Sequence, residues 1–324
     1  MLSPLSMLKY INELRNGTRK KATLYEINGQ KIVLLQALKE SKQRVFLWKT
    51  RREANITQRL SCTACDIRTV HVKRLKGSWE VSGNYVEGEE FDKALYDSLP
   101  EDEKKQLIEN MAEFLFQVHL LNVSQMDEHY ADESDDEGFL YFFLKFCYKV
   151  HCFMKTYFPL KKYGKSPYGT HSFARKRKKL YSRLSLSSSE IERMEKVSQT
   201  VCEHPEIFAY VCVCFGDISS ANFVYNQKSK RLGVFDFDCL YKGHLYIEFA
   251  LVLIAWGADF TQRTINKYNS LAQQRDMHLP KCNAYPVKIH YPLVQHLAAL
   301  SLFEHEEKEE LLELLQELYP QEAT

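Results

Sequence analysis

Residues 214–239 constrain this chain more than any other stretch, because two polar clusters there each follow an apolar run. Asp217 and Asn222 come after the first run, and Asp236 and Asp238 come after the second. Short apolar runs bounded by turn residues are typical of buried strands. A carboxylate ending one strand, an amide on the loop beyond it and a carboxylate ending the next strand can all point into one cleft.

Side chains of these types in this order suit phosphoryl transfer. In such sites one Asp orients a hydroxyl and accepts its proton, while an Asn and a second Asp hold magnesium against the phosphates of ATP. Magnesium prefers oxygen ligands and is often held by one or two carboxylates plus the phosphates. We therefore expect Asp217 to be the base and Asn222 and Asp236 to bind the metal.

The same residues resemble the aminoglycoside phosphotransferase and choline kinase superfamily. Its members show His-Gly-Asp with an Asn five residues on, then an Ile-Asp-Phe segment, and later an aromatic and acidic element. The pieces here read Phe215-Gly216-Asp217, Asn222, Phe235-Asp236-Phe237-Asp238 and Tyr246–Ala250. Phe215 therefore replaces the His that usually supports the loop.

The resemblance implies an α+β, two-lobed protein-kinase-like fold. Residues 1–86 would form a small N-terminal lobe with an antiparallel sheet and one helix, and residues 87–324 a larger, mainly helical lobe. It also implies ATP and Mg as cofactors and a kinase acting on a small-molecule hydroxyl.

Further roles follow from the resemblance. Asp238 would assist a second metal or bind substrate, and Tyr85 and Val86 would lie in the link between the lobes where the backbone meets the adenine. Glu248 stands where the family usually has an Asp that braces the catalytic loop, so we interpret it as structural.

The phosphate-binding lysine of kinase-like folds is ambiguous here. Glu53 fits the helix glutamate that orients this lysine. If the relevant strand covers 31–37, its expected slot holds no lysine and Lys39 lies just beyond. If the strand covers 44–49, the lysine is Lys49, but Glu53 then follows too closely. Lys49 and Glu53 also match an ordinary i,i+4 pair on a helix surface.

The segment Asn16–Lys21 is the weak counterpart of a phosphate loop, with one Gly instead of three. Its cations could hold phosphates in place of the missing lysine. A solvated basic turn is the simpler interpretation.

Patterning predicts most of the remaining elements. Asn28-Gly29 is a strong hairpin signal between two β-type runs, and residues 226–230 suit the turn of a second hairpin. The expected strands are 23–27, 31–35, 70–74 and 79–82, and the expected helices are 8–14, 40–60, 101–121, 139–158, 246–256 and one or two over 293–318. Ser187 and Glu190 suit the cap of a further helix that runs to about Cys202. His119 fits a buried, hydrogen-bonded core histidine.

Two charged segments stand out from this pattern. Residues 127–137 are acidic and read as a solvated loop, or as a lid over a cationic substrate. Residues 161–183 are basic and indicate a solvated helix face. The alternatives are that they contact a protein partner, an anionic substrate or nucleic acid.

Composition argues against several classes of protein. Lys+Arg 44 against Asp+Glu 42 gives a net charge of +2, which calls for neither nucleic acid nor a membrane surface. Nine scattered cysteines suit reduced thiols. The N-terminus lacks the pattern of a signal peptide, and the apolar window 249–256 is too short to span a bilayer. We expect a cytoplasmic location.

Three functions stay open at this point. The first is a small-molecule kinase of the aminoglycoside or choline type. The second is a kinase for a protein or a surface glycan on the same scaffold. The third is a non-catalytic relative that binds a nucleotide or a partner, which is suggested by the missing lysine.

Overall fold

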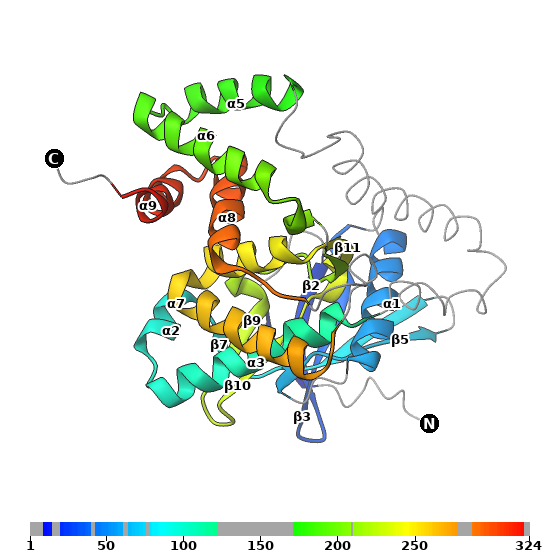
Figure 1. The fold of residues 1–324 in the computed structure, drawn as a ribbon. Coiled ribbons are helices and arrows are strands. Elements are labelled where there is room, and N and C mark those ends of the chain that lie inside the picture. Colours follow the sequence, from blue (N-terminus) through cyan, green and yellow to red (C-terminus); the bar gives the residue numbers. More distant parts are fainter. Residues whose placement is uncertain are drawn as a thin grey trace.

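An antiparallel sheet with one helix against it forms the N-terminal part of the protein (Figure 1). The computed structural model describes residues 9–14, 20–39, 43–60, 64–75, 78–121, 171–208, 210–277 and 287–320. The sheet order is β1-β2-β3-β6-β5. These strands are β1 Lys9–Glu13, β2 Lys20–Ile27, β3 Gln30–Ala37, β5 Val70–Leu75 and β6 Ser78–Asn84, and the helix is α1 Gln43–Arg59.

The β2–β3 hairpin has the turn that its sequence predicts. Asn28 and Gly29 both have positive φ, 51° and 80°, as a two-residue turn of the hairpin type requires. The same face of β2 and β3 is apolar toward α1, since Ala22, Leu24 and Val33 pack in one buried cluster with residues of the helix. The helix therefore lies on one side of the sheet.

Two expectations for this part of the chain are wrong. The helix expected over 8–14 is wrong for its described residues, because Lys9–Glu13 form strand β1, which pairs with β2 along the sheet edge. The alternative strand over 44–49 is also wrong, since these residues lie in α1.

A second sheet joins the two parts of the chain. Its order is β4-β10-β9-β7, with β4 Cys65–Ile67, β7 Glu89–Glu90, β9 Phe223–Asn226 and β10 Arg231–Val234. β4 pairs with β10 in parallel although they are far apart in sequence. A strand from before the predicted boundary at residue 86 therefore pairs with a strand from after it, and the division into lobes stays a prediction.

The C-terminal part is mainly helical. Its helices in the described residues are α2 Lys93–Ser98, α3 Glu101–His119, α5 His171–Arg183, α6 Ser188–Glu203, α7 Leu245–Gln274, α8 Tyr291–His305 and α9 Lys308–Leu318. The predicted helices over 101–121 and 246–256, the helix from Ser187 and the tail helices are thus confirmed. The helix over 139–158 and the acidic segment lie outside the described residues.

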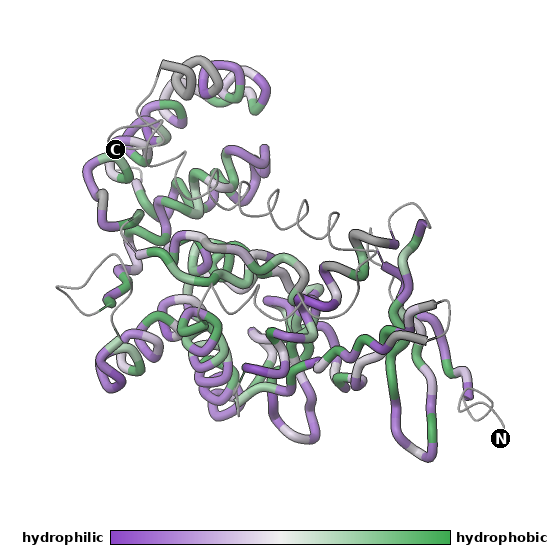
Figure 2. The backbone as a smooth tube through the Cα atoms, turned by 90° about the vertical axis from the view of Figure 1, so that its right-hand side faces the viewer, coloured by the Kyte–Doolittle hydropathy of each residue, from purple (hydrophilic) through white to green (hydrophobic). Residues whose placement is uncertain are grey.

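The helices α3 and α7 form the centre of this core. Figure 2 shows hydrophobic residues along the central strands and helices, and hydrophilic residues along the outlying helices. Of the described helices, α7 is long and apolar enough to cross a membrane by length and composition, but 56% of its most apolar window is buried inside the protein. Its packing against α3 and α8 is that of a core helix.

The described part of the basic segment packs onto neighbouring helices. Arg177 of α5 pairs with Glu195 of α6 at 2.7 Å, and Arg183 pairs with Glu306 at 2.9 Å. At least two of its cations are therefore used within the molecule. Contact with a protein partner through residues 161–183 stays a prediction.

Candidate active site

One pair of strands borders two loops: the loop that contains Asp217, here called the catalytic loop, and the loop that contains Asp236, here called the metal loop. β8 Val211–Cys214 leads into Asp217, and β11 Tyr241–His244 follows the turn η7 Phe237–Cys239. The two strands pair antiparallel, with Cys214 opposite Tyr241. Strand pairing therefore holds the start of one loop beside the end of the other.

Asn222 ties the two loops together by hydrogen bonds. Its side-chain nitrogen donates to the backbone carbonyl of Asp217 at 2.9 Å, and its backbone carbonyl accepts from the Phe235 N–H at 3.2 Å. Asn222 is 8% exposed. Because its amide nitrogen is occupied, its amide oxygen is the atom that suits a cation.

Asp236 has a backbone conformation that is unusual for a non-glycine residue. Its φ is 66° and its ψ is 61°, in the left-handed region. Such strain persists where the surrounding structure enforces it, and it gathers at functional sites. Here it turns the chain directly after β10, and the side chain of Asp236 is 25% exposed.

The loop before Asp217 approaches the metal loop too closely for any side chain on Gly216. Gly216 has φ 81°, and a Cβ there would lie 2.6 Å from the carbonyl oxygen of Cys239. Its N–H and that of Phe215 donate to the Glu248 carboxylate at 2.9 and 2.8 Å. Glu248, on the first turn of α7, is fully buried, which confirms its predicted bracing role.

His119 belongs to the support of this loop. Its Nε2 lies 3.5 Å from the Glu248 carboxylate, and its Nδ1 is hydrogen-bonded to the Tyr268 hydroxyl at 2.8 Å. It is 2% exposed. The prediction of a buried, hydrogen-bonded histidine is therefore confirmed.

Glu53 reaches the metal loop from α1. Its Oε1 accepts from the Phe237 N–H at 3.3 Å, and it is 1% exposed. Its Oε2 lies 3.6 Å from the Nζ of Lys20, which also donates to Asp236 at 2.6 Å. The lysine beside the helix glutamate is therefore Lys20 of β2.

The sequence placed Lys20 in the basic segment Asn16–Lys21, and the simpler interpretation of that segment was a solvated turn. For Lys20 this is wrong, because its side chain is 12% exposed and ion-paired twice. The signal that could have found it is the alternation of β2, where Lys20 precedes the buried residues Ala22 and Leu24 with a period of two.

The other predicted site residues are placed with less detail. Lys49 lies in α1, one turn before Glu53. Val86 is buried, and a Cβ on Gly233 of β10 would lie 2.3 Å from it, so the link between the lobes packs on the hairpin before Asp236. Tyr85 carries the Lys31 ammonium 5.3 Å from its ring centroid. The binding roles of Lys49, Tyr85 and Val86 stay predictions.

The last predicted site residue is Asp238, which was expected to assist a second metal or bind substrate. The backbone of Asp238 lies in η7, and its side chain is outside the described residues. Among the described residues, no three His, Cys, Asp or Glu side chains group into a metal site. The available donors, the Asn222 amide and the Asp236 carboxylate, fit an ion that takes its remaining ligands from phosphates and water.

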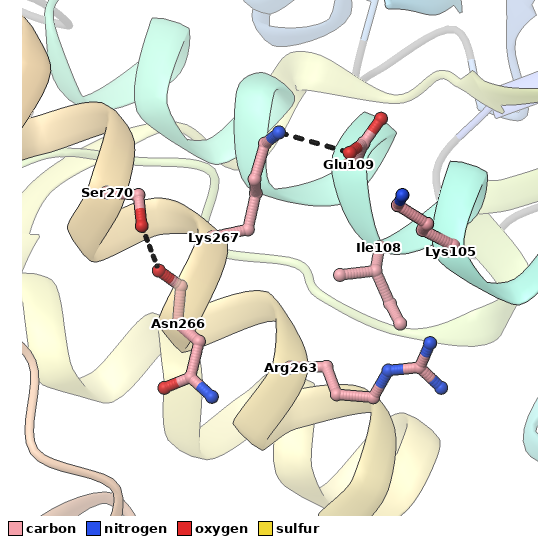
Figure 3. A pocket seen from close by; sticks show the side chains of 7 residues that line it. All are labelled: Lys105, Ile108, Glu109, Arg263, Asn266, Lys267 and Ser270. Atoms are coloured by element: carbon pink, nitrogen blue, oxygen red, sulfur yellow. Dashed lines mark hydrogen bonds and ion pairs between the residues drawn. The ribbon is translucent and has the colours of Figure 1, made fainter.

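A cavity elsewhere, of about 300 Å³, lies between α3 and α7 (Figure 3). Lys267 pairs across it with Glu109 at 3.1 Å, and Arg263 pairs with Glu101 and Asp259. These ion pairs neutralise two of the three cations that line the cavity. It contains no residue of the catalytic or metal loop.

Comparisons with known proteins agree with this geometry. The model of the phosphotransferase enzyme family matches residues 83–279, which is more than half of the chain. No protein with a curated description matches at a significant level.

Several solved structures share the fold. An aminoglycoside 2′-phosphotransferase in its GDP complex is 18% identical, with a TM-score of 0.57 over 94% of this chain and 91% of that chain. The apoenzyme of macrolide 2′-phosphotransferase MphH from Brachybacterium faecium is 9% identical, with a TM-score of 0.54 over 98% and 94%. An ADP-bound aminoglycoside phosphotransferase is 17% identical, with a TM-score of 0.51 over 96% and 91%. The predicted kinase-like fold is therefore confirmed.

Proposed function

This chain belongs to the phosphotransferase enzyme family, and from that premise we propose that it transfers the γ-phosphoryl group of ATP, with magnesium, to a hydroxyl of a small molecule. The observation that carries the proposal is the pair of hydrogen bonds by which Asn222 joins the Asp217 loop to Phe235, next to Asp236. These bonds support the proposal because they hold the backbone of Asp217 and the backbone beside Asp236 to the same residue.

Each residue has one task in this reaction. Asp217 accepts the proton of the acceptor hydroxyl as its oxygen bonds to the γ-phosphorus, and the bond from that phosphorus to the bridging oxygen breaks, which leaves ADP. The Asn222 amide oxygen and the Asp236 carboxylate would hold the magnesium ion. The ion would neutralise charge that builds up on the phosphate oxygens.

The braces around the loops support this assignment. Glu248 fixes the backbone before Asp217, and Glu53 fixes the backbone after Asp236. Positioning of the reactants supplies much of the catalysis in phosphoryl transfer. Lys20 beside Glu53 also removes the observation that suggested a non-catalytic relative.

The acceptor class follows by analogy with structural neighbours. These neighbours include a complex with GDP and kanamycin, an ADP-bound aminoglycoside phosphotransferase and a macrolide 2′-phosphotransferase. We propose a small polyhydroxylated or aminated acceptor for this chain, with ATP and GTP both to be tried as donors.

The test is turnover of labelled nucleotide with magnesium over a panel of aminoglycosides, macrolides, choline, sugars and proteins. Asp217→Asn should lower turnover by about 10²- to 10⁴-fold, the usual contribution of a general base, while nucleotide affinity stays the same. Equal turnover by the variant and the parent protein would refute the role of Asp217. Phosphorylation of proteins alone would refute the small-molecule acceptor.

A further inference from the structure

The strand that usually supplies the phosphate-binding lysine, β3, has no lysine near Glu53 on its helix-facing side. Val33 and Leu35 of β3 are buried against α1, and Ala37 follows on the same face with the period of a strand. Lys31 also shares this face, but it lies at the far end of β3, where it pairs with Glu87 at 3.4 Å. An ammonium facing Glu53 must therefore come from another element.

The register of the sheet shows where it comes from. Lys20, the first residue of β2, pairs with Ala37, the last residue of β3. Residues directly opposite in an antiparallel pair project from the same face of the sheet, with Cβ atoms about 4.5–5.5 Å apart. Lys20 therefore projects from the face that packs on α1, as its contact with Glu53 also shows.

The environment of Lys20 runs from the core to the open side of the site. Glu53 behind it is 1% exposed, the Lys20 side chain is 12% exposed and the Asp236 side chain is 25% exposed. The ammonium is thus held by a buried carboxylate on one side. On the other side it meets the carboxylate that we assign to the metal.

Arg68 is a second cation near these carboxylates, but it is held in the core. It is 7% exposed, and its guanidinium lies 4.5 Å from the ring centroid of Phe235. Burial lowers its pKa, and the nearby Glu53 and Asp236 charges oppose that shift. Arg68 therefore balances charge behind the site.

We propose that Lys20, supplied by β2, is the cation that binds the phosphates of the nucleotide, in the role that a β3 lysine has in kinase-like folds. This inference rests on the proposed function. With nucleotide and magnesium bound, Glu53 would keep its contact with the Lys20 ammonium, and Lys20 would exchange its contact with Asp236 for the phosphate oxygens. The Asp236 carboxylate would then be able to hold the metal.

The first experiment compares three single variants that each remove one ammonium and keep side-chain length: Lys20→Met, Lys21→Met and Lys49→Met. Lys21 is the matched control, because it is the next residue of β2 and pairs with Glu13 on the edge strand. Affinity for Mg·ATP, Mg·GTP and adenosine would be measured by calorimetry, beside turnover and thermal unfolding.

We expect Lys20→Met to weaken the binding of nucleoside triphosphates by about 10- to 100-fold. This is the change in affinity that corresponds to the loss of a hydrogen bond to a charged group. Adenosine affinity should stay the same, and so should all properties of Lys21→Met. The unfolding temperature of Lys20→Met should fall, because the buried Glu53 carboxylate loses one ion-pair partner. Parent-like Mg·ATP affinity and turnover in Lys20→Met would overturn the inference and leave the proposed function intact. A loss in Lys49→Met instead would assign the role to Lys49.

The second experiment moves the lysine back to β3. Ala37 faces the same way as Lys20 and borders a cavity of about 310 Å³ between β3 and α1, so a longer side chain has room there. Lys20→Met with Ala37→Lys should recover part of the lost turnover. Lys20→Met with Gln36→Lys, which points the new lysine to the opposite face, should recover none.

Each remaining outcome counts against a stated claim. Equal rescue by both double variants would mean that only overall charge matters, which contradicts a specific phosphate contact. Loss of adenosine affinity in Lys20→Met would make Lys20 structural, because adenosine has no phosphate for the ammonium to bind. A parent protein that binds neither Mg·ATP nor Mg·GTP would refute the proposed function and this inference together.

Discussion

Phe215 and Phe237 meet edge to face, with ring centroids 5.1 Å apart, and this contact joins the catalytic loop to the metal loop inside the core. Both rings are fully buried, and both also contact the ring of Phe114 on α3. The family's usual residue at position 215 is His, which supports the loop through a polar ring. Here the same support is aromatic and apolar.

Replacing Phe215 by His should therefore lower the free energy of unfolding, although it restores the residue that is usual in the family. The imidazole would bury polar atoms among Phe114, Phe223 and Phe237 without a partner, which costs about 1–3 kcal/mol. Denaturant unfolding would measure this loss, with Phe215→Leu as an apolar control for the change in shape. Greater stability of Phe215→His than of Phe215→Leu would contradict the prediction.

Gly216 tests how closely the two loops must approach. Gly216→Ala should destabilise the protein and abolish most activity, because its Cβ would lie 2.6 Å from the Cys239 carbonyl oxygen. Gly29→Ala is the matched control, since Gly29 has φ 80° and no atom within 4 Å of a Cβ. The control should cost only the left-handed conformation, about 1–2 kcal/mol.

The comparison needs both unfolding free energies and turnover for the two alanine variants. If Gly216→Ala cost no more than Gly29→Ala and kept its activity, the close packing of the loops would not matter for function.

Glu248 should contribute to both stability and activity. Glu248→Ala removes the acceptor for the buried N–H of Phe215 and the part-buried N–H of Gly216. An unsatisfied buried N–H costs about 1–3 kcal/mol. Glu248→Gln keeps one oxygen acceptor and should lose less. Chemical denaturation and turnover of the two variants would check this order, and a reversed order would show that the carboxylate does not brace the loop.

Sequence could place the candidate site residues relative to the strands because these residues are close together along the chain. Asp217, Asn222 and Asp236 lie within one strand–loop–hairpin unit, so short-range patterning placed them correctly on their loops. Lys20 is different, because its contact with Glu53 depends on the register of β2 against β3 and on where α1 packs. The alternation of β2 indicates which face Lys20 takes, but its partner depends on tertiary contacts that no local pattern contains.

The same limit explains the errors in the fold. The segment Lys9–Glu13 has a pattern that suits either helix or strand, and pairing with β2 decides it. The strand β4 is three residues long, and its partner β10 lies far away in the sequence. The hairpin at Asn28-Gly29 was predictable because the turn residues themselves require its backbone conformation.

The cap of α6 gives a prediction about pH. Ser187 accepts from the Glu190 N–H at 3.3 Å, and the Ser187 N–H donates to the Glu190 carboxylate at 2.6 Å. This backbone hydrogen bond lowers the pKa of Glu190 below its ordinary value of 4.5. A carboxyl whose pKa is lower in the folded state stabilises that state above the unfolded pKa, and this contribution is lost as the pH falls through the folded pKa.

We therefore expect Glu190→Gln to be less stable than the parent protein at pH 6, with the difference shrinking as the pH falls below 4.5. Ser187→Ala should cost about 1 kcal/mol through loss of the cap. Glu192→Gln is the control on the same helix, because Glu192 forms an exposed pair with Lys196, and such pairs contribute little. Urea unfolding of the three variants from pH 3 to pH 7 would measure these effects, and a Glu190→Gln difference that grows toward low pH would contradict the assignment.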